Sequence, residues 1–423
     1  MFSTSRSSFR RFYTTLKTKK PTDTFVLSAK RTATGAGRNS LGALHNMHPV
    51  NLLATVLKDV AREHKDQVED VIGGCVTPIG DQGANIPRLA LLKAGFPETV
   101  PGVQINRMCG SGQQAVQFAS QGIESGDMDM AIGCGVEIMS RVKIGADANP
   151  EIFKNMDPNV KMEYSFGEFP FPLIHQGVSA ELLAEKYGVT KEECDEFAAS
   201  SHEKADRAFN AGIHEKYITP VRVSKKDENG ADIPNSEYDF VRDEGIRVPV
   251  NREKLGTLKT VFRKDGKGVV TAGNASQISD GAAAVLLGSR QKAQQLGLKP
   301  QFRILARTVV GSDPVHMLDG VIPATQKALN KAGLKVDDID AFEINEAFAS
   351  VVLSWQKVLN VPMDKINIAG GAIATGHPLG ATGAKLLGRL MAVMEHNDLN
   401  TGLVTLCIGH GQAVAMVVAR DEL

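Results

Sequence analysis

The sequence is poor in aromatic residues, has no excess of charge of either sign and contains no long apolar run. Phe, Tyr and Trp make up 5% of the 423 residues, whereas 41 residues are Gly. Lys plus Arg and Asp plus Glu both number 48, which excludes an overall field that would attract nucleic acid or an anionic membrane. No apolar stretch approaches the ~18 residues that span a bilayer. The composition predicts a glycine-rich α/β protein with no nucleic-acid partner and no membrane span.

Cysteine is also scarce, and its distribution is irregular. The chain has five cysteines, none of them in a C-x-x-C pair: Cys75, Cys109, Cys134, Cys194 and Cys407. An odd and scattered set argues against a disulfide framework and against a metal site, and it favours a reducing compartment. The sequence further lacks a P-loop and lacks G-x-G-x-x-G after its first predicted strand. We therefore expect no bound metal and no resident nucleotide or redox cofactor.

The first twenty residues differ in character from the rest. They contain six basic residues and several Ser and Thr, and the first acidic residue of the chain is Asp23. A basic, hydroxylated leader without acidic residues is typical of an organellar transit peptide. We expect residues 1–22 to be such a peptide, directing the protein to the mitochondrial matrix. A disordered basic tail is the alternative.

Segments of strand character alternate with segments of helical spacing over the first 140 residues. We predict strands near residues 24–28, 70–76, 103–106 and 130–133, and helices near 50–62, 85–95 and 113–125. This alternation predicts a parallel or mixed sheet that is covered by helices on both faces.

Cys109 lies between one of these strands and the helix that follows it. Gly110 and Gly112 predict a tight turn there, so that Cys109 would sit near the positive end of a helix. Unpaired N–H groups at that end favour a thiolate, and we expect the pKa of Cys109 to be lowered from about 8.5. The same groups would bind an oxyanion on a carbonyl held against the sulfur. A buried structural cysteine is the alternative interpretation.

An internal repeat predicts two similar halves. Residues 54–71 resemble 324–339, the helix after Cys109 and the strand at 131–135 match 383–395 and 403–409, and 280–286 resembles 411–417. We expect the halves at 23–140 plus 268–296 and at 297–423, with a loop domain inserted at 141–267. In that insertion, 145–172 has the texture of a covering loop, and Thr190 opens a helix with a capping-box pattern.

The second half contains three further candidates for chemistry. Asn345 and Glu346 end a predicted strand, His377 lies in the glycine-rich segment 370–383, and Cys407 follows a strand directly. Each residue alone could have a packing role. Because these positions correspond to turns of the first half, packing of the two halves would bring them toward Cys109.

Taken together, these segments resemble the signature blocks of the thiolases. The blocks occur in the family's order and are Asn106-Arg-Met-Cys109-Gly-Ser-Gly112, Thr271-Ala-Gly-Asn-Ala-Ser276, Asp280-Gly-Ala-Ala283, Asn345-Glu-Ala-Phe348, Gly376-His377-Pro378-x-Gly380 and Cys407-x-Gly409-x-Gly411. The resemblance extends from about residue 23 to 420. It implies the five-layered αβαβα thiolase fold of two similar halves with an inserted loop domain.

The resemblance also implies roles for the reacting groups. Cys109 would be the nucleophile that takes the acyl group, His377 would accept its proton, and Cys407 would be the acid/base at the α-carbon. Asn345, through a bound water, would form one oxyanion hole with His377. The backbone N–H groups of Cys109 and Gly409 would form the second oxyanion hole.

Substrate contacts follow from the same resemblance. His175 and Ser276 would lie along the pantetheine of coenzyme A, Arg247 near its nucleotide end, and Met317 in the acyl pocket. For Arg247, a solvated charge in a charged loop is the alternative. The chain departs from the family pattern at several of the positions around these groups: Gln176 where methionine is frequent, Leu318-Asp319-Gly320-Val321 for Gly-x-Gly-Pro, His410 for a small residue and Ala413 for a glycine. An imidazole at position 410 could shift the pKa of Cys407.

The implied activity is that of an acyltransferase in fatty acid metabolism, such as β-oxidation. A thiolase would cleave 3-ketoacyl-CoA with coenzyme A into acetyl-CoA and a shortened acyl-CoA, or would run the reverse condensation. The alternatives are a short-chain acetoacetyl-CoA thiolase and a non-catalytic thiolase-like lipid-binding subunit. β-Ketoacyl synthases share the fold but use two histidines, where this chain has Asn345 and Cys407. The resemblance further implies a homodimer or homotetramer, with CoA thioesters as substrates and no bound cofactor.

Overall fold

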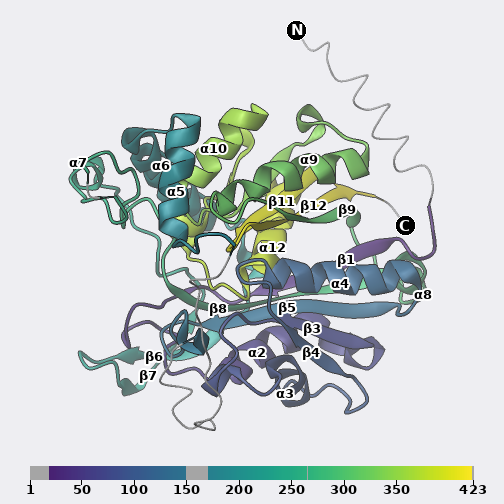
Figure 1. Cartoon of the computed structure of the whole chain (residues 1–423). Helices are drawn as coiled ribbons and strands as arrows, with labels where there is room; N and C mark the ends of the chain where they lie inside the picture. The colour runs from purple at the N-terminus through teal and green to yellow at the C-terminus, as the bar shows by residue number, and fades with distance from the viewer. Residues whose placement is uncertain (1–18, 149–169, 264, 422–423) are drawn as a thin grey trace, which may run out of the picture.

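The computed structural model describes residues 19–148, 170–263 and 265–421. The chain forms two α/β units that stack on each other through a pair of central helices, which gives five layers in the order helix, sheet, helix, sheet, helix (Figure 1). The sheets of the two units pair with each other at one edge, so that their strands form one continuous ten-stranded sheet. Residues 1–18 of the predicted transit peptide and most of the predicted covering loop lie outside the described residues. In the part of the chain that the structure describes, no helix has the length and apolar character needed to cross a membrane.

The first unit is built from the N-terminal strands and one strand that comes much later in the chain. Its elements are β1 (Thr24–Arg31), β2 (Gly35–Ala36), α2 (Pro49–Ala61), β3 (Asp70–Gly74), α3 (Ile86–Lys93), β4 (Gly102–Ile105), α4 (Ser111–Ser125), β5 (Met130–Ile138), β8 (Ser279–Ser289) and α8 (Arg290–Gln295). The predicted strands and helices of this unit are all present, with ends that differ by a few residues. Helices α2 and α3 cover the outer face of its sheet, and α4 covers the inner face (Figure 1).

The second unit repeats this plan. Its elements are β9 (Phe302–Gly311), η7 (Met317–Gly320), α9 (Val321–Ala332), β10 (Ala341–Ile344), α10 (Ala349–Leu359), α11 (Ala372–Thr375), α12 (Thr382–His396), β11 (Thr401–Ile408) and β12 (Gln412–Arg420). In the first unit β3 runs parallel to β5, which is antiparallel to β8, which is antiparallel to β1. In the second unit β10, β11, β12 and β9 follow the same order with the same directions. The predicted repeat is therefore confirmed in the strand topology.

Further elements lie between β5 and β8: α5 (Gln176–Tyr187), α6 (Lys191–Asn210), β6 (Val221–Lys226), β7 (Asp232–Phe240) and α7 (Arg252–Gly256). β6 and β7 form a two-stranded sheet of their own. The predicted capping box is present, since Thr190 Oγ1 accepts the Glu193 N–H and the Glu193 carboxylate accepts the Thr190 N–H. Two local signals, an N-cap and a helical period, were thus sufficient to locate α6.

The two central helices approach each other closely because glycine lines their contact. A Cβ on Gly383 of α12 would lie 2.0 Å from the Gln113 backbone nitrogen, and a Cβ on Gly112 of α4 would lie 2.6 Å from the Gly380 carbonyl oxygen. Any larger side chain at either position would push the units apart. Because Cys109 precedes α4 and His377 precedes α12, this contact brings the segments of both residues to the same place.

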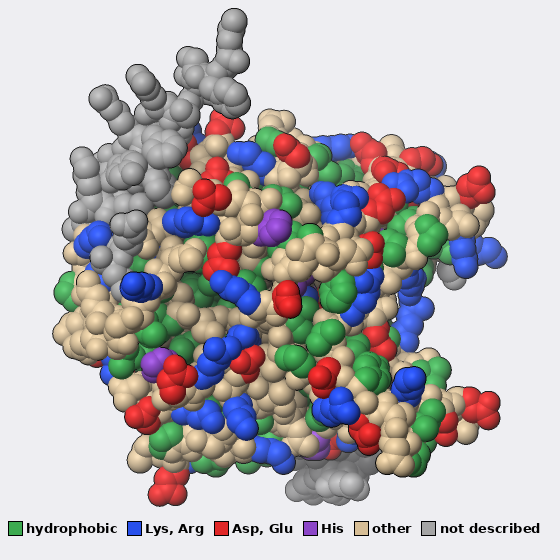
Figure 2. Space-filling model, turned by 180° about the vertical axis from the view of Figure 1, so that it is seen from behind, with side chains coloured by type: hydrophobic (Ala, Val, Ile, Leu, Met, Phe, Trp, Pro, Cys, Tyr) green, Lys and Arg blue, Asp and Glu red, His purple; other side chains and the backbone are tan. Residues whose placement is uncertain are grey.

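The surface matches the balanced composition. On the face shown in Figure 2, Lys and Arg side chains are interspersed with Asp and Glu. Exposed ion pairs of the protein include those of Arg252 with Glu196 and Glu203 on α6. Other charged side chains are buried, and several of them lie beside the candidate site.

Candidate active site

Cys109 lies on a turn that its own neighbours hold in shape. The Met108 N–H donates to Asn106 Oδ1 (2.8 Å), and the Ser111 hydroxyl donates to the Met108 carbonyl (2.6 Å). Met108 adopts a left-handed φ of 45°, whereas Gly110 has a φ of −85°. The prediction that Gly110 and Gly112 make the turn was wrong about the property of glycine that matters. These positions need glycine because there is no room for a side chain, since a Cβ on Gly110 would lie 2.3 Å from Ile408 Cδ1.

The Cys109 thiol is buried, with 6% of the residue exposed, and burial determines its charge. Burial raises the pKa of Cys109 to about 11, so the expected lowering was wrong in direction. The Gln176 side chain and the backbone N–H groups of Cys109 and Gly409 oppose the rise. At neutral pH the resting residue is a thiol, and its proton must leave when the sulfur attacks a carbon.

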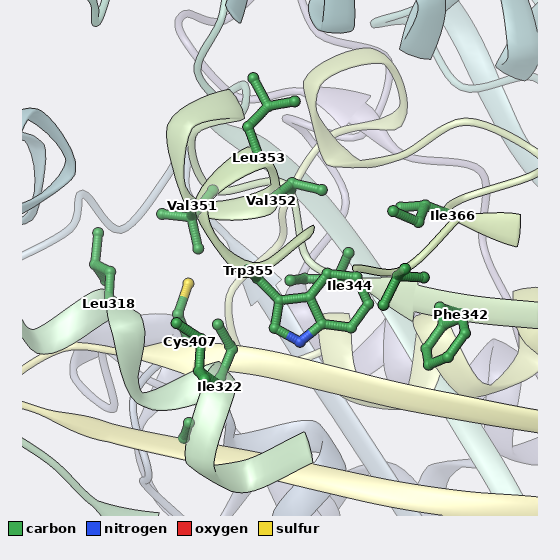
Figure 3. Close-up of a cluster of buried hydrophobic side chains, with 14 of the residues drawn as sticks. Leu318, Ile322, Phe342, Ile344, Val351, Val352, Leu353, Trp355, Ile366 and Cys407 are labelled. Atoms are coloured by element: carbon green, nitrogen blue, oxygen red, sulfur yellow. The ribbon is translucent and has the colours of Figure 1, made fainter. Parts of the chain in front are cut away.

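Cys407 approaches Cys109 from the second unit. It lies near the end of β11, where it pairs with Ala413 of β12, and it is 1% exposed. Burial raises the pKa of Cys407, and the charge that Cys109 carries when it ionises raises it further. The two turns meet at the neighbouring residues, since a Cβ on Gly110 would lie 2.3 Å from Ile408 Cδ1. Figure 3 shows Cys407 beside Leu318 of η7 and Val351 of α10. The second thiol thus lies in an apolar wall and is neutral at rest.

His377 has one defined tautomer. The Thr382 hydroxyl donates its proton to the Pro378 carbonyl (2.8 Å), so it must accept the hydrogen bond from His377 Nδ1, 2.7 Å away. Nε2 is then the unprotonated nitrogen, and Asn345 Nδ2 donates to it at 3.3 Å. Burial and the Lys385 ammonium lower the pKa of His377 to about 3. The imidazole is therefore neutral, with a lone pair on Nε2.

Three buried charged side chains hold the loop that bears His377. Burial raises the pKa of Glu137 and lowers that of Lys385, but four donors to the Glu137 carboxylate and three acceptors around the Lys385 Nζ favour the charged forms. The Glu346 carboxylate accepts the Ile373 N–H (3.1 Å), and Lys385 donates to the carbonyls of Thr375 (2.6 Å) and Gly376 (2.9 Å). Glu137, at the far end of β5, accepts the Gly380 N–H (2.9 Å). Each charge comes from a different element, so the loop is fixed from three sides.

Glu137 also fixes the surroundings of Cys109. The same carboxylate accepts the N–H groups of Val76 (2.9 Å) and Thr77 (3.2 Å) and the side-chain amide of Gln82 (2.8 Å). Val76 and Leu379 pack against Cys109 in one small apolar cluster. One carboxylate thus positions both the wall of the Cys109 thiol and the loop of His377.

The predicted coenzyme A residues divide into two groups. The His175 ring stacks on Phe262 (4.8 Å), which meets the edge of Phe348, and the Ser276 N–H donates to the Ala347 carbonyl (2.9 Å). Ser276 therefore contacts the Asn345–Phe348 segment directly, and His175 is linked to it through Phe262. Arg247 is exposed, and its N–H donates to His202 Nδ1 (3.2 Å) on α6. It lies in a loop that the Gln277 side chain ties to this region through the Gly245 carbonyl.

The two departures in the Cys407 turn have different settings. His410 is exposed and takes a left-handed φ of 60°, and its N–H meets Met317 Sδ at 3.3 Å. Its side chain is not among the groups that shift the pKa of Cys407. Ala413 is buried, with its Cβ 3.2 Å from the position a Cβ on Gly320 would take. Met317, predicted to line the acyl pocket, is buried against this turn.

Thr382, Glu137 and Lys385 were missed as residues that orient the site. Glu137 carries a signal that could have found it, since it is a single acid in the apolar strand Met130–Ile138. Lys385 is the corresponding case in α12, where its neighbours are apolar or small. A charge inside an otherwise buried element has to find a partner, but the sequence does not show which loop supplies that partner.

A layered α/β fold that brings two buried thiols and a neutral histidine together is suited to acyl transfer through a cysteine. Comparison with known proteins agrees. The model of the thiolase N-terminal domain matches residues 24–291, and that of the thiolase C-terminal domain matches 298–420. The chain belongs to the thiolase family, and it is therefore an acyltransferase.

Individual relatives match over nearly the whole chain. A steroid 3-ketoacyl-CoA thiolase of Mycobacterium tuberculosis is 42% identical, covering 94% of this chain and 94% of its own length. A 3-ketoacyl-CoA thiolase of Bacillus subtilis is 39% identical, covering 93% and 98%. Among solved structures, human mitochondrial 3-ketoacyl-CoA thiolase has a TM-score of 0.82 at 31% identity, and Bacillus anthracis acetyl-CoA acetyltransferase has 0.82 at 34%; each covers 94% of this chain and 99% of its own.

Proposed function

We propose that the protein cleaves 3-ketoacyl-CoA with coenzyme A into acetyl-CoA and an acyl-CoA two carbons shorter, and catalyses the reverse condensation. The observation that supports this most directly is the arrangement of Cys109, Cys407 and His377, in which both thiols are neutral and the histidine presents a lone pair. A retro-Claisen cleavage needs a nucleophile, a base for its proton and an acid for the carbanion that leaves.

The first half-reaction follows from these protonation states. Cys109 sulfur attacks the C3 carbonyl carbon while its proton moves to His377 Nε2. The C2–C3 bond then breaks, its electron pair passes into the acetyl-CoA enolate, and Cys407 gives its proton to C2. The products are acetyl-CoA and an acyl group on Cys109. Because the pKa of His377 is about 3, the proton leaves the thiol only as the C–S bond forms.

The second half-reaction returns both protons. The Cys407 thiolate takes the proton of the incoming coenzyme A thiol, whose sulfur attacks the acyl group. The Cys109 thiolate leaves and recovers its proton from His377. We assign one oxyanion site to His377 with a water on Asn345, whose Oδ1 is buried without a protein partner. We assign the other to the N–H groups of Cys109 and Gly409, which both act to lower the pKa of the Cys109 thiol.

We further propose His175 and Ser276 as pantetheine contacts, Arg247 as a contact of the nucleotide end, and Met317 as part of the acyl pocket. The location of His175 and Ser276 beside the Asn345–Phe348 segment supports the first two assignments. A mitochondrial matrix location, with residues 1–22 as transit peptide, and a homodimer or homotetramer remain our proposals. The human relative is mitochondrial, and the bacterial relatives named above provide no such indication.

Two single substitutions test the assignment of the thiols. With acetoacetyl-CoA and coenzyme A, Cys109→Ala should lose both the acyl-enzyme, measured by mass spectrometry, and turnover. Cys407→Ala should still be acylated by an acyl-CoA but should fail to break or form the C–C bond. The control Cys194→Ala, a buried cysteine of α6, should keep turnover. Equal loss of acylation and C–C cleavage in Cys407→Ala would contradict its role.

Chain length separates the proposal from its alternative. We would measure kcat/KM across a series of 3-ketoacyl-CoA lengths. If only acetoacetyl-CoA is turned over, the protein is a short-chain acetoacetyl-CoA thiolase. The similarity to the Bacillus anthracis acetyl-CoA acetyltransferase is the reason to test this alternative. If the purified protein neither turns over nor forms an adduct on Cys109, it is a lipid-binding subunit.

A further inference from the structure

Gln176 is the first residue of α5, and its half-buried side chain reaches the Cys407–Gly411 turn. Gly409 lies directly against it, since a Cβ on Gly409 would come within 2.7 Å of Gln176 Nε2. Met108, the neighbour of Cys109, packs against the same position, since that Cβ would also lie 2.7 Å from Met108 Cε. The Gln176 side chain and the Gly409 N–H both act to lower the pKa of the Cys109 thiol. The amide therefore enters the site from the inserted segment, between the two thiol-bearing turns.

The start of α5 is held firmly enough to fix this contact. His175 caps the helix, with its Nδ1 accepting the Gly177 N–H at 3.0 Å, and its ring stacks on Phe262. Gly177 packs against the same ring, since a Cβ on Gly177 would lie 2.1 Å from Phe262 Cε2. The residues on both sides of Gln176 thus pack on Phe262, which leaves the Gln176 side chain little freedom to turn away.

We propose that Gln176 is a further catalytic residue, whose side-chain N–H stabilises the Cys109 thiolate each time it forms. This inference extends the proposed function, because the thiolate develops twice in that cycle: when the sulfur attacks and when it leaves the acyl group. A methionine at this position, frequent in the family, would fill the same space but has no N–H to donate. The substitution therefore gives this chain a third donor at the sulfur.

The size of the effect can be bounded. A hydrogen bond to a charged group contributes about 1.5–3 kcal/mol, which corresponds to roughly one to two pKa units of the thiol. Losing it lowers the thiolate fraction about 10- to 100-fold. A more basic thiolate is intrinsically more reactive by about threefold per pKa unit, which offsets part of the loss. The net reaction of Cys109 at a fixed pH near 8 should therefore slow by about 3- to 10-fold.

The test is alkylation of the full-length protein by iodoacetamide, with the adduct on the Cys109 peptide quantified by mass spectrometry between pH 7 and 10. Gln176→Met should slow alkylation by about 3- to 10-fold at pH 8. Gln176→Glu, which has the same shape but places a negative charge near the sulfur, should slow it further. The matched control is Gln356→Met on α10, a half-buried glutamine that bonds the Val361 carbonyl far from the site and should leave the rate unchanged.

The outcomes separate this inference from the proposed function. A packing role for Gln176 predicts wild-type alkylation in Gln176→Met, and that result in a folded variant, judged by its circular dichroism and urea midpoint, would overturn the inference. The assay uses neither substrate nor turnover. If Cys109→Ala retains turnover, the proposed function fails whatever alkylation shows, and if Gln176→Met reacts at the wild-type rate, only this inference fails.

Discussion

The turn that bears Cys109 and the loop that bears His377 occupy matching places, because each leads into a central helix, yet they are held in different ways. The Cys109 turn is stabilised by Asn106 and Ser111, within three residues of it. The His377 loop depends on Glu137 and Lys385, a carboxylate of the other unit and an ammonium of α12, together with Glu346. The turn of the nucleophile is thus held by local hydrogen bonds, and Glu137 reaches it only through the wall at Val76, whereas the loop of the base is itself held by buried charge from a distance.

The difference between the two segments can be explained by what each side chain has to do. A thiol attacks through one atom, so a short turn is sufficient to aim it. An imidazole has to present a particular nitrogen to that atom, which requires both a fixed ring and a fixed tautomer. Thr382 provides the tautomer, and the buried charges fix the loop. Removing a remote charge should therefore damage the site more than removing a local bond.

The largest expected effect is that of Glu137→Gln. The carboxylate accepts N–H donors from Val76, Thr77, Gln82 and Gly380, and an amide in its place would turn an N–H toward donors. We expect the free energy of unfolding to fall by about 3 kcal/mol. We expect kcat to fall by about 100-fold, because the His377 loop and the Cys109 wall both shift. Urea unfolding and steady-state turnover measure the two effects.

Two variants with smaller expected losses of stability serve as comparisons for Glu137→Gln. Ser111→Ala removes the local bonds of the Cys109 turn and should cost about 1 kcal/mol. Glu124→Gln removes an exposed pair with Arg307 and should cost less than about 1 kcal/mol. If Ser111→Ala were the more damaging of the buried changes, the contrast between the two segments would be reversed.

Thr382→Val tests the tautomer without removing charge. Valine has the shape of threonine but cannot accept the His377 Nδ1–H, so the proton is free to occupy Nε2 and block the base. We expect kcat to fall by about 10- to 100-fold with KM nearly unchanged, since general-base catalysis contributes about 10²- to 10⁴-fold. Thr382→Ser keeps the hydroxyl and should restore most of the activity. A rise in KM with an unchanged kcat would assign Thr382 to substrate binding instead.

The burial of His377 should also appear as a pH dependence of stability. Its pKa is about 3 in the folded protein and about 6.5 in the unfolded chain, so below pH 6.5 the unfolded state binds the proton and folding weakens as pH falls. His377→Gln removes this cost. Relative to wild type, the variant should gain about 1 kcal/mol in free energy of unfolding between pH 6.5 and 5.5. Urea titrations at both pH values measure the gain.

The control for that measurement is Gln356→Met, which alters a half-buried glutamine of α10, a residue type that does not titrate. The difference between this variant and wild type should change little over the same pH interval. A constant difference for His377→Gln as well would mean that the imidazole has the same pKa in the folded and the unfolded chain, so that burial does not keep it neutral below pH 6.5.

The sequence predicted the local features of the site and missed the remote ones for a physical reason. Alternating strands and helices, the capping box at Thr190 and the repeat follow from patterns within a few residues, and the structure reproduces them. The pKa of Cys109 was predicted in the wrong direction because burial, a property of the whole fold, outweighs the nearby N–H groups. The partners of Glu137 and Lys385 were not predictable, because they come from segments as much as 351 positions away.

The smallest expected effect is that of His410→Gly, which tests whether an exposed residue influences the Cys407 turn. His410 follows Cys407 by three positions but is exposed, and the pKa of Cys407 is raised by burial and by Cys109. The pH profile of kcat should therefore stay unchanged. Stability should shift by less than about 1 kcal/mol, because glycine relieves the left-handed φ of 60° while gaining freedom in the unfolded chain. A shifted kcat profile in His410→Gly would show that the Cys407 turn, unlike the Cys109 turn, is tuned by an exposed charge.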